Sequence, residues 1–187
     1  MSTFRRSIGL AAAMLTLAAC DQTGPRPSGE AGGPAAASFS HAATSDLSGY
    51  YRPAAVVRLG RWRLDHVFIG QPPAFEAWAG GARGGSGPVM IQFSAVAGGP
   101  TDAAVSGGPR GVTARVLPTS YSVTDTRLNF EGRSPELGVV SFDGRLDPNA
   151  LATARRNLGR DGVVLTGTLT AAGQSVRNVR LNWSMGD

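Results

Sequence analysis

Residues 163–184 read VVLTGTLTAAGQSVRNVRLNWS, and this stretch predicts a β-hairpin. In its second half Val179, Leu181 and Trp183 alternate with polar residues, so one face is apolar and the other faces water. A period of two is typical of an antiparallel strand that is buried on one side. Val176 breaks the alternation, which a β-bulge or the beginning of the strand would explain.

The same alternation recurs toward the N-terminus and predicts a mostly β domain. It is found at 61–68, 88–97, 112–117, 121–130 and 139–146. In the first of these stretches one face would carry Trp62, Leu64, His66 and Phe68. Clusters of glycine and proline separate the stretches, as turns and loops require. We expect an antiparallel β-sandwich or β-barrel, and the pattern does not choose between them.

One short accessory helix is expected at about residues 148–158. Asp147 is a suitable N-cap and Pro148 occupies the first helical position. Apolar residues recur at helical spacing from Leu151, and Gly159 is a stop signal.

The C-terminal part is similar to YceI-like periplasmic proteins. The similarity rests on Tyr121–Val123, Leu128–Phe130, Val164–Thr170 and Gly173–Val179. It implies a lipocalin-like antiparallel barrel around a long isoprenoid or fatty chain. This chain is shorter between the matching pieces and has a glycine-rich N-terminal half without a counterpart, so no binding residue is carried over.

The N-terminus has the layout of a secretory signal peptide. Arg5 and Arg6 precede an apolar run from Ile8 to Ala19. Twelve residues cover about 18 Å as a helix, which is short of the ~30 Å hydrocarbon core of a bilayer. We therefore expect residues 1–19 to be a targeting segment that is removed.

The end of this segment, Leu17-Ala18-Ala19-Cys20, resembles the lipobox of bacterial lipoproteins. The resemblance implies that Cys20 carries acyl chains, which hold a protein firmly when two or more are present. We expect a lipid-anchored protein of the bacterial cell envelope, at the outer membrane and facing the periplasm. The inner membrane is the alternative, because Asp21 follows the anchor and in enteric bacteria an Asp there tends to retain a lipoprotein.

Residues 20–46 are expected to form the lipidated Cys20 and a flexible tether, and residues 47–187 a single β-rich domain. The tether is rich in Gly, Pro, Ala and Ser and offers few large apolar side chains to bury. His41 would lie in this tether without a role.

Composition excludes several classes of function. All 18 basic residues are arginine, which removes lysine-dependent chemistry such as Schiff-base formation. One Cys and two His cannot form a zinc cluster or a disulfide framework. The sequence contains no stripe of basic residues interleaved with aromatic residues, which is the pattern typical of nucleic-acid binding. We therefore expect no nucleic-acid partner. We expect no metal and no cofactor.

Two groups of polar residues are candidates for a catalytic site. Asp65 and His66 could form a charge-oriented base, and paired carboxylates could hydrolyse glycosides; the acidic candidates are Glu131, Glu136, Asp143 and Asp147. Packing of the histidine and solvation of the acids explain these residues more simply. We expect no catalytic residue, with a carboxylate hydrolase as an open third class.

Aromatic residues are the remaining candidates for recognition. Tyr50 and Tyr51 are adjacent, and Phe75 and Trp78 lie in a short aromatic segment, so some of these side chains could form an exposed partner-binding surface. We expect a non-catalytic binding or accessory subunit of an envelope assembly, with a protein partner. The alternative is a barrel-type carrier of a small apolar or lipid ligand.

Overall fold

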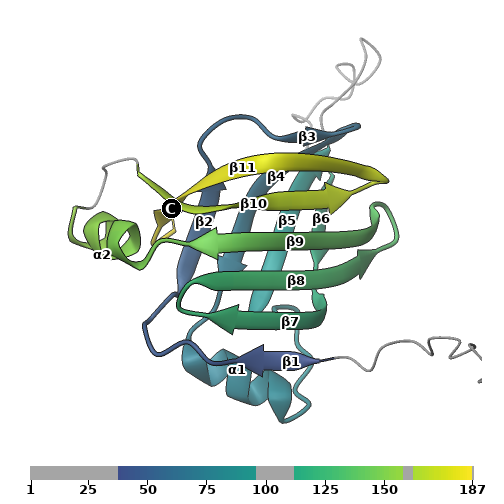
Figure 1. Ribbon diagram of the computed structural model, residues 1–187. Helices are drawn as coiled ribbons and strands as arrows, with labels where there is room; N and C mark the ends of the chain where they lie inside the picture. The colour runs from purple at the N-terminus through teal and green to yellow at the C-terminus, as the bar shows by residue number, and fades with distance from the viewer. Residues whose placement is uncertain (1–37, 96–111, 158–161, 187) are drawn as a thin grey trace, which may run out of the picture. The chain divides into compact units, whose positions relative to one another are not determined.

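A computed structural model describes residues 38–95, 112–157 and 162–186 (Figure 1). The expected signal peptide, Cys20, most of the expected tether and Gly159 lie outside the described residues.

Within the described ranges, eleven strands form one curled sheet, and two helices lie at its margins. The elements are β1 (Phe39–His41), β2 (Gly49–Pro53), β3 (Arg58–Leu59), β4 (Trp62–Ile69), α1 (Pro72–Ala79), β5 (Val89–Ala95), β6 (Thr113–Val116), β7 (Pro118–Thr124), β8 (Arg127–Ser134), β9 (Gly138–Leu146), α2 (Pro148–Arg156), β10 (Val163–Ala171) and β11 (Gln174–Ser184).

The order of the strands shows a barrel-like fold. The sheet runs β1-β7-β8-β9-β10-β11-β2-β4-β5-β6, with β3 paired to β4. It curls so that β7–β11 form one wall and β2, β4, β5 and β6 lie behind it (Figure 1), and β6 contacts β8 where the curl approaches itself. Every pair is antiparallel except β1 with β7, which is parallel. The expected mostly β fold is confirmed, and it is a single curled sheet instead of a sandwich.

The core lies on the inner face of this curl. Tyr51, Phe93 and Phe142 are its largest fully buried side chains, and they belong to one continuous apolar cluster. Gly144 and Gly167 face each other across β9 and β10, and a Cβ atom at either position would meet the ring of Phe142. These glycines therefore make room for an aromatic ring over the sheet.

A β-bulge in β4 overturns the expected face of His66 and Phe68. The register of β4 against β5 shifts between Leu64 and His66. One extra residue reverses the direction of every following side chain. Trp62 and Leu64 therefore point into the core, whereas His66 and Phe68 lie on the outer face.

Of the two explanations for the position of Val176, the structure shows the β-bulge, because β11 already begins at Gln174. Leu169 pairs with Val176 and Gly167 pairs with Val179, so Thr168 faces two residues of β11. Asn178 takes a positive φ of 57° there, which asparagine tolerates better than most residues.

The single strand expected at 121–130 is wrong, because the chain turns at Asp125 and Thr126 and forms the β7–β8 hairpin. The apolar positions change from odd-numbered residues in β7 to even-numbered residues in β8, and a single strand over 121–130 does not allow for this change of phase. The accessory helix is confirmed as α2: the Asp147 carboxylate accepts hydrogen bonds from the backbone N–H groups of Asn149 and Ala150, and Leu151 is buried.

The expected end of the tether at residue 46 is also wrong, because residues 38–46 belong to the folded unit. β1 adds to the edge of β7. The carboxylate of Asp125 accepts hydrogen bonds from the backbone N–H groups of Thr44 and Ser45 and from the Thr44 hydroxyl. Composition indicates low burial, but it cannot reveal that β1 pairs with a strand 82 residues further along the chain.

Candidate functional site

Three of the four aromatic residues expected at an exposed surface are buried. Tyr51 is 0 % exposed, Phe75 3 % and Trp78 5 %. Phe75 and Trp78 are three positions apart in α1, so they share the helix face that packs on the sheet. The expectation that these three side chains lie on an exposed surface is therefore wrong, and Tyr50 alone of the four is partly exposed.

The N-terminal strand completes the packing beneath α1. The ring of His41 stacks on Phe75 with 3.9 Å between centroids, and Phe39 meets Trp78 edge-on at 6.3 Å. Arg83 covers the Trp78 ring at 4.3 Å. His41, expected to be without a role, thus covers part of the core.

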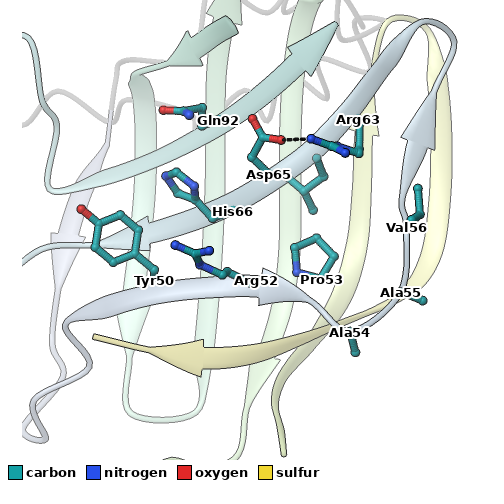
Figure 2. A pocket seen from close by; sticks show the side chains of 11 residues that line it. Tyr50, Arg52, Pro53, Ala54, Ala55, Val56, Arg63, Asp65, His66 and Gln92 are labelled. Carbon is teal, nitrogen blue, oxygen red and sulfur yellow. Dashed lines mark hydrogen bonds and ion pairs between the residues drawn. The ribbon is translucent and has the colours of Figure 1, made fainter. Parts of the chain in front are cut away.

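Tyr50 lies beside a groove of about 850 Å³ on the outer face of β2, β4 and β5 (Figure 2). Its floor carries Arg52, Asp65, His66 and Gln92, and the chain from Pro53 to Val56 forms one rim. A second hollow of about 520 Å³ also has Tyr50 in its lining, together with Phe68, Trp183 and Met185 among others. We call the two hollows together the Tyr50 groove.

The bulge in β4 builds the centre of this groove. Because it turns His66 and Phe68 outward, both rings meet Tyr50, at centroid distances of 5.0 and 5.1 Å. The sequence pattern missed this cluster because an uninterrupted alternation would place His66 and Phe68 inside.

Asp65 is held in place on the floor of the groove. The Ser94 hydroxyl donates to one carboxylate oxygen, and Arg63 Nη2 lies 3.5 Å from the other. A serine hydroxyl that donates to a carboxylate is not oriented for activation by an imidazole. Asp65 therefore holds the side chains of Ser94 and Arg63 in place, and this arrangement does not activate Ser94 as a nucleophile.

The other acidic candidates are only partly brought together. Glu131 and Asp143 line a shallow hollow of about 400 Å³ on the outer face of β8 and β9. Asp147 caps α2, and Glu136 accepts a hydrogen bond from the Ser134 hydroxyl, which lowers the pKa of Glu136. Among the described residues, no group of three or more His, Cys, Asp or Glu side chains could hold a metal ion.

Neither α1 nor α2, the helices in the described ranges, is long and apolar enough to cross a membrane. Comparison of the chain with protein-family models, with curated proteins and with solved structures yields no match.

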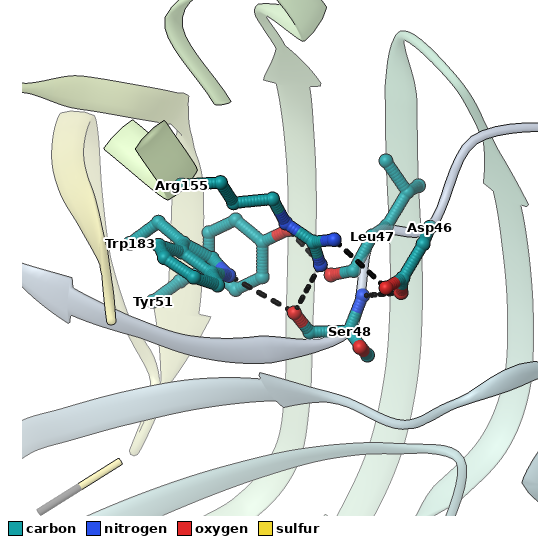
Figure 3. Close-up of polar contacts among 6 residues, drawn as sticks. All are labelled: Asp46, Leu47, Ser48, Tyr51, Arg155 and Trp183. Atoms are coloured by element: carbon teal, nitrogen blue, oxygen red, sulfur yellow. Dashed lines mark hydrogen bonds and ion pairs between the residues drawn. The ribbon is translucent and has the colours of Figure 1, made fainter. Parts of the chain in front are cut away.

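An ion pair fastens α2 to the chain that enters β2, at one end of the Tyr50 groove (Figure 3). Arg155 Nη1 lies 2.7 Å from Asp46 Oδ2, and Arg155 Nη2 donates to the Ser48 carbonyl at 2.8 Å. The indole of Trp183 donates to the same carbonyl at 2.9 Å. The hydrogen bond from Arg155 is the main cause that lowers the pKa of Asp46 below its ordinary value of 3.8.

This ion pair predicts a pH-dependent contribution to stability. Because the pKa of Asp46 is lower in the folded state than in the unfolded state, the stabilisation is present at neutral pH and is lost as the pH falls below about 4. Asp46 is half exposed, so solvent screening limits the effect to about 1 kcal/mol. We expect Asp46→Asn to lower the free energy of urea unfolding near neutral pH, and the difference from the unmodified protein to shrink in acid.

The matched control is Glu76→Gln, which removes an exposed carboxylate from α1. It should leave the free energy of unfolding nearly unchanged at every pH. A loss for Asp46→Asn that persists unchanged in acid would show that the ion pair is not its cause.

Proposed function

We propose that the protein is a lipid-anchored lipoprotein of the bacterial cell envelope, whose β domain is a non-catalytic binding subunit. The lipobox-like sequence ending at Cys20 supports the anchor. The Tyr50 groove supports the binding role and is the observation on which that role depends. We propose the outer membrane as the location of the anchor, with the inner membrane as the alternative because Asp21 follows Cys20.

The groove favours a peptide segment of a partner protein as its occupant. Its polar part offers Arg52, Arg63 and Gln92, and its apolar part offers the rings around Tyr50. Two of the large apolar side chains that are strongly exposed in the described ranges, Val56 at 68 % and Met185 at 71 %, line it. Aromatic and arginine side chains surrounded by apolar contacts are typical of the central part of protein interfaces.

The test uses the full chain isolated from its own membranes. Intact-mass analysis should show that residues 1–19 are absent and that Cys20 carries lipid. A photo-crosslinking residue at the groove, Val56→benzoylphenylalanine, should then give a discrete adduct with an envelope protein. Tyr50→Ser should reduce the yield of this adduct about tenfold or more, because a central tyrosine in an interface is often worth ~2 kcal/mol.

Two controls sharpen this test. Val139 is also exposed but lies on β9, outside the Tyr50 groove, so Val139→benzoylphenylalanine should not give the same adduct. Tyr50→Phe keeps the ring and should restore most of the yield. If Tyr50→Ser crosslinks as well as the unmodified protein while the mass shows lipid on Cys20, the anchor stands and the groove assignment fails.

The carrier of an apolar ligand has less support. The inner face of the curled sheet, where such a carrier would hold its ligand, is occupied by packed side chains that include Tyr51, Phe93 and Phe142. Native mass spectrometry of detergent-extracted protein distinguishes the two roles. A lipid-sized additional mass beyond the anchor would favour the carrier, whereas a stoichiometric protein companion would favour the subunit.

A further inference from the structure

Three arginines form a row across the outer face of the sheet. Arg127 of β8 lies opposite Arg145 of β9, and Thr166 of β10 is the register partner of both Arg145 and Arg180 of β11. All three arginines are exposed. With strands about 4.8 Å apart, the row spans only about 15 Å of backbone. We call Arg127, Arg145 and Arg180 the arginine row.

The arginine row is a local excess of positive charge. Like charges directly opposite each other on a sheet repel, and Arg127 faces Arg145 in this way. In the part of the chain that the structure describes, no ion pair joins any of the three to a carboxylate. On the same face the next row carries Asp143, whose register partners are Asn129 and Thr168. An external anion would relieve the repulsion within the arginine row.

We propose that the arginine row docks the β domain onto the anionic lipid headgroups of the membrane that carries the Cys20 anchor, an inference that rests on the proposed function. Guanidinium groups recognise phosphate through paired hydrogen bonds. An anionic leaflet attracts each arginine near its surface by about 1 kcal/mol.

The chain between Cys20 and β1 is short, so weak contacts are sufficient to hold the domain against the bilayer. Seventeen residues separate Cys20 from Ser38, and a chain of this length spans at most about 60 Å. An anchored domain therefore stays within reach of the bilayer, where its effective concentration is high. The row also ends beside the rim of the Tyr50 groove, because the Ala54 N–H donates to the Arg180 carbonyl. A partner in the groove would then meet the domain close to the membrane.

The experiment measures how close the domain of the full acylated chain lies to a bilayer. Val139→Cys, on the outer face of β9, receives a fluorescent dye, and energy transfer to labelled lipids is recorded. Vesicles contain either phosphatidylcholine alone or a mixture with phosphatidylglycerol. We expect strong transfer only with the anionic vesicles, and its loss at about 0.5 M salt, where charges are screened beyond a few Å.

Two triple variants then test whether the energy transfer depends on the arginine row. Replacing Arg127, Arg145 and Arg180 together by Gln should lower the ratio of docked to undocked domain about a hundredfold, at roughly fivefold for each arginine. The matched control replaces Arg58, Arg61 and Arg177 by Gln, which removes the same charge from exposed positions outside the row and should leave docking intact.

The outcomes separate docking from anchoring. Flotation with neutral vesicles reports the acyl anchor alone, and its failure would overturn the proposed function without touching the docking result. Equal energy transfer on neutral and anionic vesicles would overturn the docking proposal, as would equal losses in the two triple variants. Binding of the arginine row to a soluble acidic protein but not to anionic vesicles would also overturn it.

Discussion

Replacing Trp78 by alanine is expected to lower the free energy of unfolding by about 3–5 kcal/mol, the usual range when a buried tryptophan is truncated. The side chain lies between α1 and the sheet and is 5 % exposed. Its ring meets Phe39 edge-on and is covered by Arg83 at 4.3 Å. Truncation would therefore leave a cavity and also loosen the N-terminal strand. Chemical denaturation of the purified full chain measures the loss.

The comparison with Tyr50→Ala makes this prediction specific. Tyr50 lies partly exposed on the outer face, so its truncation should cost about 1 kcal/mol and should weaken partner capture instead. If Trp78→Ala proved as stable as the unmodified protein and lost a partner, α1 would present an interaction surface after all. We expect Trp78→Ala to lose stability and Tyr50→Ala to lose partner capture.

Replacing Gly167 by alanine is expected to cost about 3 kcal/mol, at the upper end of the usual range for an overpacked core. A Cβ atom there would lie 2.4 Å from the Asp143 carbonyl oxygen and 2.8 Å from the Cα atom of Gly144. Both are backbone atoms, so neither can rotate away. The strands β9 and β10 would have to separate, which would also disturb the Phe142 ring beside Gly167.

Gly162→Ala is the matched control for Gly167→Ala. Gly162 directly precedes β10, and a Cβ atom there would meet nothing within 4 Å. Its replacement should change the free energy of unfolding by no more than about 0.5 kcal/mol. Equal stability of the two variants in thermal and urea unfolding would show that β9 and β10 tolerate the extra methyl group.

The alternation of apolar and polar residues along the sequence predicts the positions of many of the strands. Val139–Leu146 and Val163–Thr170 correspond closely to β9 and β10, because each strand buries one face against the same core. The pattern failed where a long strand bends or turns. Asp65 inserts a bulge into β4, so the side chains after it face the opposite way. At Asp125 the chain turns, and the apolar positions shift from odd-numbered residues in β7 to even-numbered residues in β8.

The candidate site was less predictable than the fold. The sequence indicates Tyr50 as an aromatic residue that could face a partner, and Asp65 and His66 as a possible base, but it does not indicate that these residues share one groove. Arg52 comes from β2, His66 from β4 and Gln92 from β5, and only the pairing of these strands places them together. The same holds for the arginine row, whose members lie on β8, β9 and β11.

The sequence by itself determined the β class and the capped helix α2, because each depends on residues close together in the chain. The tertiary structure alone decided which side chains are exposed. Phe75 and Trp78 became core when α1 packed on β1 and β7, and His66 became surface when a single extra residue reversed the faces of β4. Burial depends on contacts between distant segments, and these contacts exist only once the sheet has curled.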